Sequence, residues 1–222
     1  MIIIGHRGAR GLAAENTIAS IDAAIDHKVN AVEFDVHVTK DLVPVLNHDD
    51  TIVSIDGHKL VIANSSLVEL RAQKPDIATL DEVFINVNHR ANLMIEIKSS
   101  TNIDSIVALT RKFLKNGWTT DELCFCSKNQ STLVALYKSA PEIPRVVIER
   151  WSGVKAHFRV RQVHAKGASM NQVWLWWGFV RSVKTSGYEL YAYTLNDPKK
   201  ARRWAKYGLT AVITDFPDRF EE

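Results

Sequence analysis

The sequence predicts an α/β protein, a (β/α)8 TIM barrel with a short insertion after the second strand. Short β-branched apolar runs alternate along the chain with longer segments of helical spacing, which favours a parallel sheet with crossover helices. Eight such units fit into 222 residues without a linker, and this favours a closed barrel over a doubly wound sheet. The chain also lacks a GxGxxG or P-loop pattern. We therefore expect a single domain spanning residues 1–222.

The predicted strands are short and apolar, and the segments between them have the spacing and end signals of helices. Asn196-Asp197-Pro198, for example, is typical of a helix start. Only residues 42–75 break the rhythm, with an extended piece at 42–47 and an insertion at about 49–75. The strands are predicted at residues 2–5, 31–38, 93–98, 123–127, 145–148, 162–170, 190–194 and 211–214. The helices are predicted at 15–27, 80–88, 104–114, 130–139, 173–185 and 198–207, with a short, poorly formed helix at 151–161.

Composition excludes several classes of protein. With 46% hydrophobic and 24% charged residues, the chain is neither disordered nor collagen-like. It has no apolar run of the roughly 18 residues that a transmembrane segment needs, and its first residues do not resemble a signal peptide. Cys124 and Cys126 share one face of a predicted strand, with Cα atoms too far apart for an easy bridge, so we expect free, buried thiols and a cytoplasmic location. The net charge of +3 is too small to indicate nucleic-acid binding.

Charged residues occupy one face of three predicted strands. Glu33 and Asp35 alternate with apolar residues in the second strand, Glu96 and Lys98 do so in the third, and His6 ends the face begun by Ile4. A single strand of this kind is usually a solvated edge. In a parallel barrel, however, helices cover the outside, so charge is tolerated chiefly at the mouth formed by the carboxyl ends of the strands. Together these strands predict an active site at that mouth.

The residue types indicate the chemistry. Glu33, Asp35 and Glu96 would repel one another unless a cation lay among them, and oxygen ligands suit Mg²⁺ or Ca²⁺ better than Zn²⁺. Two histidines, His6 and His48, can remove and supply protons, while Arg7 and Lys98 can hold the oxygens of an anionic phosphorus substrate. The residues do not show which histidine is the acid. They predict metal-assisted cleavage of a small-molecule phosphoester.

Several short motifs occur in one order along the chain: His6-Arg7-Gly8, Glu15-Asn16-Thr17, Glu33-x-Asp35, His48-Asp49, Glu96-Ile97-Lys98, Tyr193-Thr194-Leu195-Asn196 and Ile213-Thr214-Asp215-Phe216-Pro217. In this order the sequence resembles the glycerophosphodiester phosphodiesterase family. The resemblance implies a TIM barrel that hydrolyses glycerophosphodiesters to glycerol 3-phosphate and an alcohol with a divalent metal. It implies that Glu33, Asp35 and Glu96 are metal ligands, His6 the proton acceptor, His48 the proton donor, and Arg7 and Lys98 phosphate contacts.

The sequence departs from the family pattern around the insertion. Ala14 stands where a Pro is common, Asp41-Leu42 where an Asp-Gly turn is common, and the usual Arg-Thr-Thr run after His48-Asp49 is absent. Substrate preference is therefore less defined than the chemistry. One alternative function is a lysophospholipase D acting on lysophospholipids, and another is a catalytically silent binding protein, against which the intact set of acid and base residues argues.

Other residues have two interpretations. Glu15 could line the site, but the first turn of a helix explains it more simply. Ser127, Asn171 and Asn196 could bind glycerol or phosphate, although turn chemistry explains each about as well. His37 is expected beside the site rather than in it. Residues 174–179 hold four aromatic side chains on a predicted outer helix, which indicates local packing, a homodimer face or a weak membrane contact.

Overall fold

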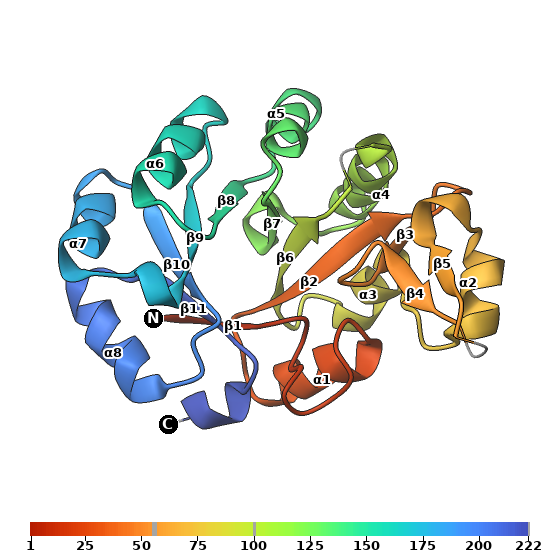
Figure 1. Cartoon of the computed structure of the whole chain (residues 1–222), viewed down its shortest axis with the longest axis horizontal. Coiled ribbons are helices and arrows are strands. Elements are labelled where there is room, and N and C mark those ends of the chain that lie inside the picture. The colour runs from red at the N-terminus through yellow and green to blue at the C-terminus, as the bar shows by residue number, and fades with distance from the viewer. Residues whose placement is uncertain (55–56, 100, 222) are drawn as a thin grey trace.

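The computed structural model describes residues 1–54, 57–99 and 101–221, in which eight parallel strands form a closed barrel (Figure 1). The barrel closes because β1 pairs with both β11 and β2, with Ile2 opposite Ala211 and Ile4 opposite Ala31. The predicted TIM barrel is confirmed. Its strands are β1 (Ile2–Gly5), β2 (Ala31–Val38), β6 (Asn92–Ile97), β7 (Leu123–Ser127), β8 (Arg145–Glu149), β9 (Gly167–Asn171), β10 (Glu189–Tyr193) and β11 (Ala211–Thr214).

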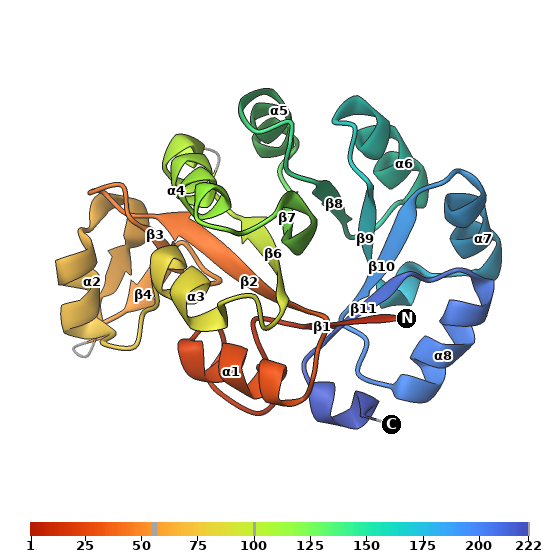
Figure 2. The ribbon, with the colours of Figure 1, turned by 180° about the vertical axis from the view of Figure 1, so that it is seen from behind.

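Helices surround the barrel on its outer side, as both views of the ribbon show (Figures 1 and 2). They are α1 (Ile18–Asp26), α3 (Leu80–Val87), α4 (Ile103–Lys115), α5 (Gln130–Ser139), α6 (Gly153–Gln162), α7 (Trp177–Thr185) and α8 (Pro198–Tyr207). Short 3-10 turns are η1 (Ile62–Asn64), η2 (Thr120–Glu122), η3 (Gln172–Trp174) and η4 (Pro217–Phe220). In the part of the chain that is described, no helix has the length and apolar character needed to cross a membrane.

The insertion is attached at the carboxyl end of β2. There β3 (Pro44–Leu46) pairs antiparallel with β2, and β4 (Thr51–Val53) and β5 (Lys59–Val61) form a separate two-stranded sheet followed by α2 (Leu67–Gln73). The predicted insertion also includes residues 55 and 56, which lie outside the described residues. It has a small apolar core of its own, made of Val45, Ile52, Ile62, Leu70 and Ile77.

Three predicted elements begin three or more residues later than expected, whereas the other elements agree within two residues at each end. The helix expected at 15–27 begins at Ile18, because Thr17 is its N-cap and Asn16 has a left-handed φ of 58°. The strand expected at 162–170 begins only at Gly167, since residues 153–162 form the regular helix α6 behind its N-cap Ser152. The helix expected at 173–185 is interrupted. Residues 172–174 form η3, and α7 begins at Trp177.

The interior of the barrel is apolar at its amino end and charged at its carboxyl end. Ile4, Ala31, Met94, Tyr191 and Ile213 belong to an inner cluster that also contains both cysteines. Cys124 and Cys126 are free and buried, as expected, and burial raises the pKa of the Cys124 thiol to about 11. Above this packed layer, the same alternation of side chains places the acidic residues of β2 and β6 inside the barrel.

Candidate active site

A cavity of about 330 Å³ lies at the carboxyl ends of the barrel strands. This is the end at which TIM barrels place their active sites, because loops rather than packed side chains line it. The cavity has an acidic floor from β2 and β6 and a basic wall from residues that follow β1, β7 and β8. Its polar lining includes His6, Arg7, Arg10, Glu33, Glu96, Lys128, Arg150, Asn171 and Tyr193.

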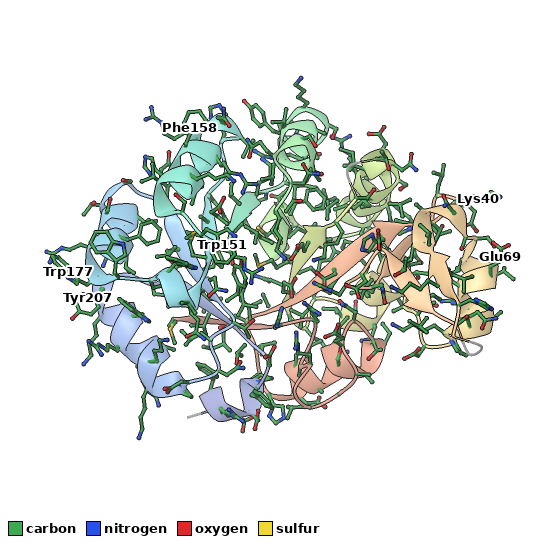
Figure 3. The ribbon with its side chains drawn as sticks, in the orientation of Figure 1. Lys40, Glu69, Trp151, Phe158, Trp177 and Tyr207 are labelled. Atoms are coloured by element: carbon green, nitrogen blue, oxygen red, sulfur yellow. The ribbon has the colours of Figure 1, made fainter. Side chains whose placement is uncertain are left out.

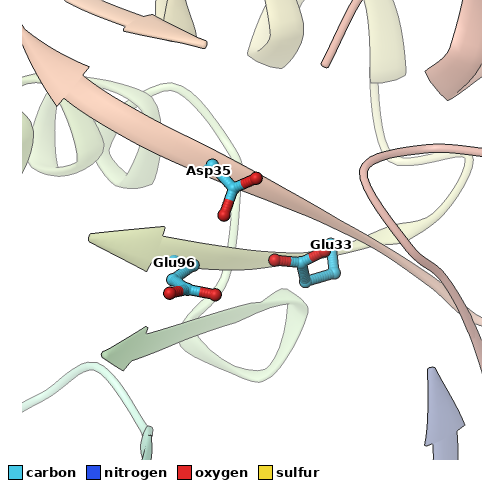
Figure 4. Close-up of side chains that lie close together, drawn as sticks. All are labelled: Glu33, Asp35 and Glu96. Carbon is cyan, nitrogen blue, oxygen red and sulfur yellow. The ribbon is translucent and has the colours of Figure 1, made fainter. Parts of the chain in front are cut away.

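Glu33, Asp35 and Glu96 form a buried acidic cluster (Figure 4). Asp35 and Glu96 face each other across the β2–β6 pair, and Glu33 lies two residues earlier on the same face of β2. One carboxylate oxygen from each of the three lies within 4.8 Å of the others. This spacing is suited to a shared divalent cation.

Three cations of the chain contact this cluster, and the most distant is Lys128, whose Nζ lies 3.8 Å from Glu96 Oε1. Lys98 Nζ lies 2.9 Å from Asp35 Oδ1 and 2.9 Å from Glu96 Oε1. Arg7 Nε lies 3.2 Å from Asp35 Oδ2. Burial alone would lower the pKa of Lys98, but the two carboxylates outweigh it and raise the pKa above its ordinary value. Lys98 is therefore held as a cation, with its charge directed at the carboxylates.

The carboxylates of Glu33 and Asp35 have opposite pKa shifts. Burial would raise the pKa of Asp35, but Lys98, the Asn16 amide and Arg7 together lower it. Burial raises the pKa of Glu33 well above its ordinary value, and the charges of Asp35 and Glu96 raise it further. Among the described residues, Glu33 forms no ion pair, and its carboxylate accepts one hydrogen bond, from the Arg7 backbone N–H at 3.0 Å. Glu33 is thus the member of the cluster that lacks a cation.

The loop after β1 is shaped around this cluster. Arg7 has a left-handed φ of 50°, which turns its backbone N–H towards Glu33 and its guanidinium towards Asp35. Asn16 is also left-handed, and its amide both donates to Asp35 Oδ2 and accepts from the Asp35 backbone N–H, each at 3.0 Å. Gly8, at φ 79°, packs against Ser20 so closely that a Cβ atom would lie 2.4 Å from it. These contacts fix the floor of the cavity.

His6 is oriented by a carboxylate. Its Nδ1 lies 2.6 Å from Asp215 Oδ1, and Asn196 donates to the other carboxylate oxygen at 3.0 Å. Burial would raise the pKa of Asp215, but the hydrogen bonds from His6 and Asn196 lower it. An ionised Asp215 accepts the Nδ1 proton, which leaves Nε2 of a neutral imidazole as the atom able to accept a proton. His6 lines the cavity, so it has the arrangement of a general base.

His48 lies outside this cavity. It follows β3 and lines a neighbouring depression together with Glu15, Asn47 and Asp49. Its Nδ1 is 2.7 Å from Asp49 Oδ1, so it too is oriented by a carboxylate. Glu15 connects the two hollows, because its carboxylate accepts a hydrogen bond of 2.7 Å from Arg7.

The remaining candidates have different surroundings. Glu15 precedes α1, so the interpretation as a first-turn residue is wrong, and it pairs with Arg7 instead. Ser127 is buried, donates to the Ile97 carbonyl and accepts from Asn129 N–H, which is turn chemistry. Asn171 lines the cavity and also caps η3. Asn196 contacts Asp215 and thereby positions His6 indirectly.

Sequence reasoning did not identify as site residues several residues that line the cavity, nor Asp215, which contacts the cavity residue His6. Lys128, Arg150 and Asp215 each directly follow a barrel strand, namely β7, β8 and β11. Because the carboxyl ends of parallel strands meet at the mouth, this position was the signal that could have identified them. Arg10 and Tyr193 also line the cavity, and burial raises the pKa of Tyr193 to about 12, so its hydroxyl stays protonated.

Comparisons with known proteins agree with this geometry. The model of the glycerophosphoryl diester phosphodiesterase family matches residues 6–219. YhdW of Bacillus subtilis is 28% identical over 98% of this chain and 96% of its own length. A phosphodiesterase of Oleispira antarctica, solved with the product sn-glycerol-3-phosphate, superposes with a TM-score of 0.86 at 29% identity over 99% of this chain and 94% of its own. Human lysophospholipase D GDPD1 is 22% identical over 99% of this chain and 84% of its own length. This chain belongs to the glycerophosphoryl diester phosphodiesterase family.

Proposed function

We propose that this enzyme hydrolyses glycerophosphodiesters to glycerol 3-phosphate and an alcohol, using a divalent metal held by Glu33, Asp35 and Glu96. The observation that carries the proposal is the buried acidic cluster beneath a cavity with a basic wall. The acidic floor of the cavity suits a metal cation, and the basic wall suits the anionic phosphodiester that the metal would bind. The product complex of the Oleispira antarctica relative supports the same substrate class.

The acidic cluster fits a hard divalent cation. Its donors are carboxylate oxygens, which Mg²⁺ and Ca²⁺ prefer, and Glu33 has no cationic partner among the described residues. When bound, such a cation would draw charge from a non-bridging phosphate oxygen and make the phosphorus more electrophilic.

The residues of the chain supply the proton transfers. His6 Nε2 is the proton acceptor, because Asp215 fixes the Nδ1 proton on the opposite side of the ring. We assign His48 as the proton donor to the leaving alcohol, which requires that the substrate extend from the cavity towards the depression that His48 lines. Both assignments follow the family resemblance. The orientation of each imidazole by a carboxylate supports them.

The phosphate position follows from the cations that line the cavity. Arg7 is one of them although it pairs with Glu15 and Asp35. Lys98 is not among the lining residues, because it bridges Asp35 and Glu96. Lys128 and Arg150 have exposed side chains at the mouth and line the same cavity. We propose that Arg7, Lys128 and Arg150 contact the non-bridging oxygens and that Lys98 holds Asp35 and Glu96 in place.

We further propose that residues 1–222 act as one domain in a reducing, cytoplasmic setting. The barrel cannot close without both its first and its last strand, because β1 pairs with β11 along its whole length. Both cysteines are free thiols inside this barrel, where a reducing compartment would leave them unchanged.

The test is product release from glycerophosphocholine, measured as glycerol 3-phosphate with Mg²⁺, Ca²⁺ or EDTA. We expect turnover with a divalent metal, none in EDTA, and none in Glu33→Gln with either metal. Glu142→Gln, which changes an exposed carboxylate on the barrel exterior, is the matched control and should behave as wild type. Full turnover in EDTA would refute the metal assignment, and no turnover with any metal would refute the substrate class.

Lysophospholipids are a second candidate substrate. The observation that favours them is a group of exposed tryptophans beside the cavity, of which Trp151 directly follows the cavity residue Arg150. The human relative named a lysophospholipase D supports the same idea. Choline release from lysophosphatidylcholine, compared with release from glycerophosphocholine, tests it directly.

A further inference from the structure

A group of exposed apolar side chains borders the cavity on the β8–α6 and β9–α7 connections. This aromatic rim consists of Trp151, Val154, Val173, Trp174, Trp176 and Trp177. Its four tryptophans keep between 46% and 62% of their surface exposed, whereas Trp118 is buried in the core. Trp151 and Trp174 contact each other with ring centroids 5.7 Å apart, and Trp176 and Trp177 with centroids 6.4 Å apart. Isolated exposed apolar residues are ordinary, but two exposed tryptophan pairs close together in the chain indicate an interaction surface.

The rim is joined to the active site. Arg150 lines the cavity, and its guanidinium lies 4.5 Å from the ring centroid of Trp151. Asn171, also in the cavity lining, caps the η3 turn that carries Val173 and Trp174. In Figure 3, Trp151 lies inward of Phe158 and Trp177, which lie on the outer sides of α6 and α7. A partner that covered Trp151 and Trp174 would therefore also face the mouth of the cavity, while Trp177 extends the rim to the outer side of α7.

The charge around the rim is strongly one-sided. Residues 150–188, which we name the basic quarter, contain seven Lys and Arg and no Asp or Glu. Three of the seven pair with carboxylates just outside this range, Lys155 and the buried Arg159 with Glu149, and Lys166 with Glu189. The surface charge of the basic quarter therefore comes from the other four, Arg150, Arg161, Arg181 and Lys184. The rest of the chain keeps 21 of the 28 Lys and Arg against all 25 Asp and Glu, so it is net negative. Within α7, Arg181 and Lys184 follow Trp177 by four and seven residues, so the three side chains share one face of the helix. All three are exposed. Among the described residues, neither Arg181 nor Lys184 has an ion-pair partner.

We propose that the aromatic rim and the basic quarter dock this protein on an anionic lipid surface, with the cavity mouth facing the lipid. Tryptophan is favoured at the headgroup level of a bilayer, and exposed Lys and Arg attract anionic headgroups. A second copy of the chain is a poorer occupant, because a symmetric interface would press two basic quarters together. Val154 and Val173 add aliphatic surface that suits lipid and cannot stack on nucleic-acid bases.

The first experiment measures co-sedimentation with vesicles, without turnover, so its result does not depend on the proposed function. The vesicles are phosphatidylcholine alone and phosphatidylcholine with phosphatidylglycerol at a ratio of 7:3. We expect binding to the anionic vesicles that falls as salt is raised, and much weaker binding to the neutral ones. Trp174→Ser with Trp177→Ser should weaken binding at least about tenfold, and Arg181→Glu with Lys184→Glu at least about tenfold, since each basic residue near the surface contributes about fivefold.

The matched control replaces two apolar residues that are at least as exposed and lie on other helices. Val68→Ser with Ile85→Ser should leave vesicle binding unchanged. Circular dichroism and hydrolysis of a soluble glycerophosphodiester by the tryptophan variant, both expected at wild-type values, show that its weaker binding is not unfolding. Lack of binding to the anionic vesicles at low salt overturns the proposal. So does a dimer that the tryptophan changes dissociate, or binding to single-stranded RNA, if either occurs without binding to vesicles.

Discussion

Glu33 should destabilise the metal-free protein, and Glu33→Gln should remove that cost. The glutamine keeps the size of the side chain and can still accept the hydrogen bond from the Arg7 backbone N–H. It cannot ionise next to Asp35 and Glu96. We expect the variant, in EDTA at neutral pH, to be more stable than wild type and inactive with any metal.

The magnitude follows from the repulsion within the cluster, and linkage gives the sign of its pH dependence. At an effective dielectric constant of about 20, two unit charges about 4.8 Å apart repel by roughly 3 kcal/mol, and 4.8 Å is the largest separation within the cluster. The linkage argument uses the raised pKa of Glu33. Above about pH 4.3 this raises the free energy of the native state, because the Glu33 carboxyl must either keep its proton or ionise beside Asp35 and Glu96.

The sign of the pH dependence is specific. Because the pKa of Glu33 is raised in the fold, wild type loses stability relative to the variant as pH rises above about 4.3, until the folded pKa is passed. Below pH 4 the two proteins should be equally stable. Urea unfolding of both in EDTA, at pH 4, 5.5 and 7, measures this, and a difference of 3 kcal/mol corresponds to a shift in Tm of about 6–12 °C. Equal stability at pH 7 would show that Lys98 and Arg7 already neutralise the cluster, and would refute the reasoning.

Three further predictions concern other parts of the site and its support. His6→Ala should lower kcat by at least about 100-fold while the protein stays folded. The control, His27→Ala, breaks a surface pair of the same 2.6 Å length with Glu221 and should keep wild-type kcat. A kcat of His6→Ala within threefold of wild type would exclude His6 as the general base. Asp215→Asn should lower kcat about 10–100-fold. Because the fold lowers the pKa of Asp215, its ionised form stabilises the protein above about pH 4. That stabilisation is lost as pH falls through the folded pKa. In urea titrations, Asp215→Asn should therefore lose less stability than wild type between about pH 5 and pH 3. Arg159→Ala should cost about 3–5 kcal/mol in denaturant unfolding, because the buried carboxylate of Glu149 loses its cationic partner at 3.1 Å and keeps only the exposed Lys155 at 3.7 Å. A loss below about 1 kcal/mol would contradict this account.

The sequence predicted the fold class and the acidic cluster because both depend on strict alternation. A strand that places Val32 and Phe34 against the outer helices must place Glu33 and Asp35 inside the barrel. A closed parallel barrel then brings Glu96 beside them, since β6 is paired with β2 in register. For these residues, the local alternation and the pairing of distant strands predict the same position, inside the barrel at its carboxyl end.

The sequence was less informative where tertiary contacts override local pattern. The helical spacing from residue 15 is broken because Asn16 is drawn into a hydrogen-bonded pair with Asp35, nineteen residues away. The spacing through residues 173–185 is broken because the Asn171 side chain caps a 3-10 turn and Leu175 is buried, which exposes three neighbouring tryptophans. His48 follows an insertion whose path no periodicity describes. Its position relative to His6 is therefore set by the small core of that insertion rather than by the barrel.

The pairing of β1 with β11 has a consequence for how the protein folds. Ile2 and Ala211 are register partners, so the contact that closes the barrel joins residues more than two hundred positions apart in the chain. Loop closure over that distance is entropically slow, and such nonlocal pairing lowers folding rates. During synthesis, β1 emerges first and must wait for residues 211–214 before it has both neighbours. Until then Ile2–Gly5 presents an unpaired strand edge, which makes this segment a natural site for chaperone binding or aggregation.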